Sequence, residues 1–207
     1  PLAVDVTVDY DKKIKNNFFG VGSATRFSDR VSYTREPLVT SVALSRGFGR
    51  TVGQAGVKYV SILNEPAQSS EDQTALPAAL ELGRRSYASV FGSVRYDSRE
   101  SFTNPSAGIV LQGEAEVSPG SSASGAKFGR VAAWFQSYSV LFFPKTVFAL
   151  RLGGQSLFGD SLPMHVLLPL GGSNNLRGSS LDRYLDKSYA LMNAELRFPL
   201  VGRLGGM

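Results

Sequence analysis

The sequence contains no cysteine, and it has one histidine and one tryptophan in 207 residues. The absence of cysteine excludes disulfide bonds and thiolate metal sites, but it does not identify the compartment. His165 stands alone, so no metal-ligand spacing exists and no Ser/His/Asp triad can be argued. We therefore predict no catalytic residue, no metal site and no cofactor, and we expect that the chain is not an enzyme.

Long apolar runs are also missing. The longest candidate, residues 139–143, is far shorter than the roughly 18–20 residues of a membrane-spanning helix. The net charge is +5, but the basic residues are spread along the chain, so no nucleic-acid partner is expected. Pro1 opens directly into a strand pattern, and we expect any export signal to lie outside this segment.

What the sequence does contain is repeated alternation of apolar and polar residues. Within 107–118, Leu111 shares one face with other apolar residues, while Glu114 and Glu116 share the opposite face. The clear stretches are 3–10, 107–118, 145–153 and 188–198, and weaker ones lie at 31–46, 52–63, 84–97 and 128–140. Alternation with a period of two predicts strands with one apolar and one polar face. About eight strands are expected, each near the ~9–11 residues with which a tilted strand crosses a bilayer.

The connections between these stretches alternate in length. Long gaps at 11–30, 64–83, 119–126 and 154–187 are interleaved with shorter turns at 47–51, 98–106 and around 143–144. Long loops on one side and short turns on the other are typical of outer-membrane barrels. We therefore predict one all-β domain over 1–207, an antiparallel transmembrane β-barrel whose immediate partner is outer-membrane lipid. A soluble β-barrel that binds apolar ligands also alternates and is an alternative.

The charged residues within the strands lie mostly opposite the cleaner apolar face. A Lys or Arg facing lipid at mid-membrane would cost ~2–4 kcal/mol, so we expect these side chains to line the lumen. Glu114 and Glu116 resemble a paired-carboxylate site, but lumen lining is the favoured interpretation, because barrel interiors are commonly charged.

Four stretches occur in a characteristic order. They are 16–22 (NNFFGVG), 96–99 with 104–108 (YDSR and NPSAG), 170–179 (LGGSNNLRGS) and 193–199 (NAELRFP). In this order they resemble the bacterial surface antigen domain. That domain is the C-terminal barrel of the outer-membrane protein assembly and translocation superfamily, which includes the barrel-assembly insertases. Ser179 departs from the pattern, because the family usually has an aromatic residue there.

The resemblance also implies how much of a barrel is present. The family's barrel normally has sixteen strands, with the long loop between the eleventh and twelfth. Here about seven expected strands precede the loop and one follows it, so the resemblance implies an internal fragment that lacks about four strands at each end. A complete eight-strand barrel is the alternative, since barrels of that size exist.

The resemblance implies a functional loop. In the family the long loop, here 154–187, folds back into the barrel, and the arginine at its tip pairs with carboxylates on the inner wall. Carried over, the tip comprises Gly171, Gly172, Leu176, Arg177 and Gly178. The candidate partners of Arg177 are Glu195, Glu114 and Glu116. The alternative is that Arg177 caps a solvated glycine-rich loop. The segment lacks the Lys-Ser/Thr end of a phosphate-binding loop.

The function implied by the resemblance is insertion or translocation of proteins at the outer membrane, with unfolded outer-membrane or secreted proteins as clients. An open seam between first and last strands would template an incoming strand. The alternative is a barrel anchor or passive channel, serving an attached domain or small solutes. Periplasmic polypeptide-binding repeats before the barrel would favour the first function, and a lipase domain the second.

Overall fold

The computed structural model describes residues 2–67, 76–120, 126–142, 146–160, 162–173, 175–201 and 204–206. The strands are β1 (Leu2–Tyr10), β2 (Lys13–Phe18), β3 (Val31–Phe48), β4 (Thr51–Pro66), β5 (Gly83–Asp97), β6 (Gly108–Pro119), β7 (Lys127–Val140), β8 (Val147–Phe158), β9 (Leu168–Leu170), β10 (Tyr184–Asp186), β11 (Ser188–Val201) and β12 (Leu204–Gly206). Three short 3-10 helices, η1 (Phe27–Asp29), η2 (Ala78–Leu80) and η3 (Met164–Val166), lie in the connections. Among the described residues, no helix is long and apolar enough to span a membrane.

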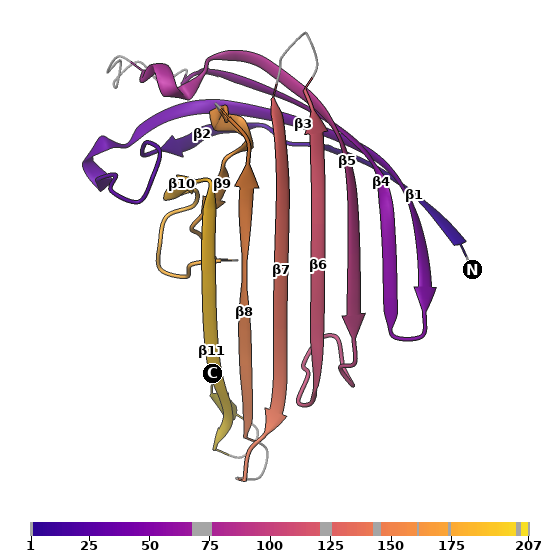
Figure 1. The fold of residues 1–207 in the computed structure, drawn as a ribbon. Helices are drawn as coiled ribbons and strands as arrows, with labels where there is room; N and C mark the ends of the chain where they lie inside the picture. The colour runs from indigo at the N-terminus through magenta and orange to yellow at the C-terminus, as the bar shows by residue number, and fades with distance from the viewer. Residues whose placement is uncertain are drawn as a thin grey trace.

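The long strands form one curved antiparallel sheet in the order β1-β3-β4-β5-β6-β7-β8-β11-β12, with β2 also paired to β3. The loop that carries β9 and β10 lies inside the curve (Figure 1). Each of the eight stretches predicted from alternation corresponds to one of these strands, which confirms the all-β antiparallel prediction. The prediction of a loop over 11–30 is wrong for residues 13–18, which form β2.

Strands β1 and β2 are one strand interrupted opposite a proline. Tyr10 pairs with Leu38 and Lys13 pairs with Arg35, so the register continues across the break. Between them the Asp11 amide donates to the Pro37 carbonyl at 3.2 Å. Pro37 has no amide to donate in return, and so the ladder is broken at this point. Beyond it, a bulge between Lys13 and Asn16 shifts the register.

The outer face of the sheet is apolar and exposed. Leu111, Phe135, Leu152 and Met192 lie opposite one another across β6, β7, β8 and β11, and directly paired residues project to the same face. Met192 is 70% exposed, and Val57, Val90, Val117 and Leu196 are also exposed. An exposed apolar surface of this extent indicates contact with lipid or another apolar partner. The structure thus places the apolar face outward, as predicted.

The inner face carries the polar residues and the main core. The curved sheet, here called the wall, and its connections contribute one half of this core: Phe18, Tyr33, Leu80, Phe128 and Leu157. They pack with Met164, Val166, Leu167, Leu168 and Leu185 of the long loop. The apolar core of the described chain therefore lies between the wall and this loop.

The long loop begins later than predicted. Strand β8 continues to Phe158, so the loop covers 159–187 rather than 154–187. The pair Gly153 and Gly154 looks like a strand end, but both residues pair with neighbouring strands. A Cβ at Gly153 would lie 2.2 Å from the Trp134 ring, and one at Gly154 would lie 2.4 Å from the Tyr189 carbonyl oxygen. Glycine is needed here for close approach within the sheet.

The connections are sorted by side as predicted. The β4–β5 connection with η2 and the loop with η3, β9 and β10 lie at one end of the sheet, and the tight β3–β4 turn lies at the other (Figure 1). The predicted turn around 143–144 and most of the predicted loop at 119–126 fall outside the described residues.

Candidate functional site

The long loop is fastened to the sheet near its C-terminal end. Strands β9 and β10 form a small hairpin, and the Leu157 amide donates to the Lys187 carbonyl at 2.7 Å. The Gly22 amide donates to the Leu185 carbonyl, also at 2.7 Å. The loop is thus joined both to β8, which precedes it, and to the distant β2–β3 connection.

The stretch 16–22 forms part of the surface against which this loop packs. Phe18 and Phe19 are each 1% exposed, and the guanidinium of Arg183 lies 4.9 Å from the centroid of the Phe19 ring. Arg183 also donates to the side chain and carbonyl of Thr25, at 2.8 and 2.6 Å. Sequence reasoning missed Arg183, because nothing in its local pattern points to residues so far away in the chain.

The loop tip is a compact turn built on glycine. Gly171, Gly172 and Gly178 all have positive φ, a conformation that favours glycine. A Cβ at Gly171 would lie 2.2 Å from the Ser180 carbonyl oxygen, so this residue is also required for space. The Gly172 amide donates to the Ser179 carbonyl at 3.2 Å, which closes the tip. Leu176 is half-buried, and position 174 lies outside the described residues.

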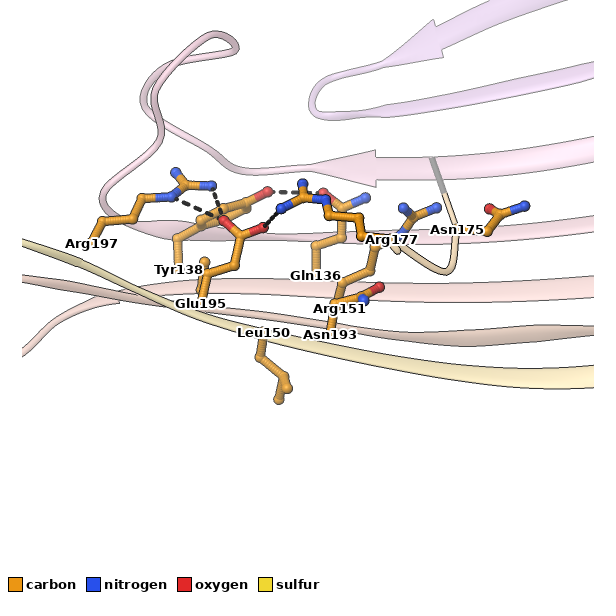
Figure 2. A pocket seen from close by; sticks show the side chains of 10 residues that line it. Gln136, Tyr138, Leu150, Arg151, Asn175, Arg177, Asn193, Glu195 and Arg197 are labelled. Carbon is orange, nitrogen blue, oxygen red and sulfur yellow. Dashed lines mark hydrogen bonds and ion pairs between the residues drawn. The ribbon is translucent and has the colours of Figure 1, made fainter. Parts of the chain in front are cut away.

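The closed tip holds Arg177 beside the inner wall (Figure 2). Arg177 Nη1 lies 3.1 Å from Glu195 Oε1, and Arg197 contacts the other oxygen of the same carboxylate at 3.2 Å. Both arginines point toward Glu195, whereas Leu150 points to the opposite side of the sheet (Figure 2). These residues border a polar cavity of about 210 Å³. The Arg177 side chain is 74% exposed and the Glu195 side chain 26%.

Glu114 and Glu116 do not contact Arg177, contrary to the expectation that they were candidate partners. Glu116 binds Lys58 at 2.5 Å, the Arg130 guanidinium, and the Ser89 hydroxyl at 2.6 Å. Glu114 accepts a hydrogen bond from Gln112 at 2.6 Å. The reason is strand order, because β7 and β8 separate β6 from β11. Three strand spacings of ~4.8 Å put the two strands about 14 Å apart.

His165 is a buried packing residue. Its Nδ1 lies 3.3 Å from Glu81 Oε2, which also accepts the Met164 amide at 3.1 Å, and its ring stacks on Tyr87. Burial lowers the pKa of His165, while Glu81 opposes that shift. The contact joins the long loop to the β4–β5 connection. No cluster of metal-binding side chains occurs within the described ranges.

The second motif stretch forms the β5–β6 turn. Asp97 binds Arg99 and Arg95, so both ion pairs stabilise the start of this turn. The Glu100 carboxylate accepts hydrogen bonds from the Ser106 and Ala107 amides, at 2.5 and 2.8 Å. These bonds to Ser106 and Ala107 lower the pKa of Glu100 from its ordinary 4.5 to about 2.

The chain matches a protein family model and a set of solved structures. The family model described as the Omp85 superfamily domain matches residues 1–206. Among solved structures, the chain is similar to BamA from Haemophilus ducreyi lacking POTRA domains 1–3, with a TM-score of 0.68 and 14% identity. The alignment covers 97% of this chain and 43% of that one, so the chain spans less than half of the BamA chain. No curated protein matches the sequence.

Proposed function

Because the chain belongs to the Omp85 superfamily, we propose that it forms part of an outer-membrane β-barrel that inserts other proteins into the membrane or moves them across it. The observation that carries the proposal is the long loop folded onto the polar inner face, with Arg177 beside Glu195. The apolar outer face fits a lipid-contacting wall. The proposed clients are unfolded outer-membrane or secreted proteins.

We further propose that the chain is an internal portion of a sixteen-strand barrel and that its role involves no covalent chemistry. In this arrangement Arg177 lies at the loop tip within the lumen, where the exposed part of its guanidinium is open to water and to passing polypeptide. A passive channel is the weaker alternative. The loop packs a cluster of apolar side chains against the inner wall, and this packing occupies space that solute would need.

The test is insertion of an unfolded β-barrel client into liposomes that contain the full-length protein. Folded client is scored by its altered gel mobility without heating. We expect faster client folding than in empty liposomes, slower folding with Arg177→Ala, and no change with Arg46→Ala, a matched arginine at the far end of β3. Ion conductance without any acceleration of client folding would overturn the proposal in favour of a channel.

A further inference from the structure

A groove of about 690 Å³ lies on the outer face of the wall, where β5, β6, β7 and β8 run side by side. Its floor is formed by Val94, Gly113 and Ala133. These residues are direct neighbours across the strands, because Val94 pairs with Gly113 and Gly113 pairs with Ala133. Larger side chains, two positions nearer the end of the sheet that holds the β3–β4 turn, form one rim: Tyr96, Leu111, Phe135 and Leu152.

Contacts within the described chain do not explain the glycine in this floor. Gly113 does not have positive φ, and nothing lies within 4 Å of an added Cβ. The same holds for Gly53, which pairs with Val94 on its other side. Gly153, by contrast, is pressed against Trp134. Glycine inside a strand weakens the strand and often marks a place where a ligand approaches closely. The space beside Gly53 and Gly113 is open to a molecule outside the chain.

The row of neighbours leads to a cation. Arg46 pairs directly with Gly53 and therefore projects to the same outer face. Gly53 has no side chain that would close the groove on this side. The Arg46 guanidinium lies 4.9 Å from the centroid of the Phe48 ring, and no carboxylate pairs with it among the described residues. An arginine that faces lipid is tolerated near the membrane surface, where it contacts headgroup phosphates.

The row also runs from the end of the strands toward their middle. Arg46 is two residues from the end of β3 at Phe48, whereas Ala133 is seven residues from the end of β7 at Val140. The difference, at ~3.3 Å per residue in a strand tilted by ~45°, corresponds to roughly 12 Å of depth. One leaflet of the hydrocarbon core is about 15 Å thick. The row thus follows the path of one acyl chain, from the membrane surface almost to the middle of the bilayer.

We propose that this groove binds a phospholipid of the leaflet at the turn end, with its phosphate on Arg46 and one acyl chain along Gly53, Gly113 and Ala133. A second copy of the chain would also cover apolar surface. The position of Arg46 at the outer end of the row favours instead a molecule with an anionic head and an apolar tail. The inference requires that the wall lie in a membrane, and it does not depend on the proposed insertion of clients.

The test is photo-crosslinking of the full-length protein, in neutral detergent, to an equimolar amount of phosphatidylglycerol that carries a diazirine at mid-chain. We expect adducts mainly on the segments that contain Val94, Gly113 and Ala133. Gly113→Leu should weaken capture roughly tenfold, because leucine excludes about two methylene groups of the lipid from the groove. The matched control is Gly129→Leu, which should leave capture unchanged. Gly129 is also an outer-face strand glycine, and nothing lies within 4 Å of an added Cβ.

The headgroup contact is tested separately. Arg46→Gln should weaken capture roughly fivefold, whereas Lys127→Gln, which removes an exposed cation at the other end of the outer face, should not. Equal capture of a diazirine-bearing diacylglycerol by the parent protein would overturn the proposal.

Two further results would also overturn it. Adducts spread evenly over the outer face of the parent protein would indicate an ordinary belt of lipid. A dimer of the parent that Gly113→Leu abolishes would assign the groove to a second copy. A parent protein that captures the lipid in the groove but does not insert clients would contradict the proposed function alone.

Discussion

Apolar packing, rather than the Arg177 ion pair, should hold the long loop in the barrel. Leu168 is 3% exposed and lies in the cluster between loop and wall. Its truncation to alanine should cost about 2–5 kcal/mol. The Arg177–Glu195 pair is short, but Arg177 is 74% exposed, and such pairs contribute about 0–1 kcal/mol. Leu168→Ala should therefore raise the undocked population at least about thirtyfold, and Arg177→Ala at most about fivefold.

The assay uses a thiol introduced by Val166→Cys, because this sequence has no cysteine and Val166 is 7% exposed. Labelling of the thiol then reports undocking of the loop. Leu196→Ala, on the exposed outer face, removes the same side chain without touching the loop and should leave the labelling rate unchanged. If Arg177→Ala accelerates labelling as much as Leu168→Ala does, the ion pair holds the loop and the reasoning fails.

Three further perturbations test the wall and its turns. Glu116→Gln should destabilise the barrel by about 2–4 kcal/mol in urea titration, because it leaves two partly buried cations without their carboxylate, and Glu114→Gln, which breaks no ion pair described here, should cost less. Leu152→Arg, in the middle of β8 on the outer face, should cost about 2–4 kcal/mol, whereas Leu152→Phe should be tolerated; equal stability of the two variants would contradict a lipid-facing wall. For Glu100, stabilisation of the β5–β6 turn should be complete above about pH 4.5 and lost as pH falls toward 2, because the pKa is lowered on folding. Hydrogen exchange at the turn, compared with Glu100→Gln, measures this loss.

Much of the wall could be predicted because each strand carries its own two-face pattern. Leu111 and Glu114 are assigned to opposite faces by parity alone, and the register agrees. Sequence pattern did not predict a residue's role correctly where contact with a neighbouring strand determines which residue type fits. Gly153 looks like a strand end, yet it is a strand residue pressed against Trp134. Strand β2 was missed because its pattern is short and broken opposite Pro37.

The candidate site shows the same division. The tip was predicted from the resemblance of stretch 170–179 to the family's loop motif, and in the structure Gly171, Gly172 and Gly178 of that stretch have positive φ. To predict that Arg177 pairs with Glu195 and not with Glu116, one must know the order of the strands in the sheet. The alternation of apolar and polar residues tells which face a residue lies on, but it does not give that order. Two contacts join segments that are far apart in the sequence: Glu81 with His165, and Thr25 with Arg183. A local sequence pattern does not predict such pairs.

The Arg183–Thr25 contact spans 158 positions of the chain. The hairpins of the wall, by contrast, close between neighbouring strands such as β3 and β4. Closing a long loop of chain costs more entropy and slows the contacts that depend on it. We therefore expect the strands of the wall to pair first and the long loop to dock last. A nascent barrel would then pass through a stage in which its lumen is empty. A variant that loses the Arg183 contact would be delayed at this late step while its sheet forms at the normal rate.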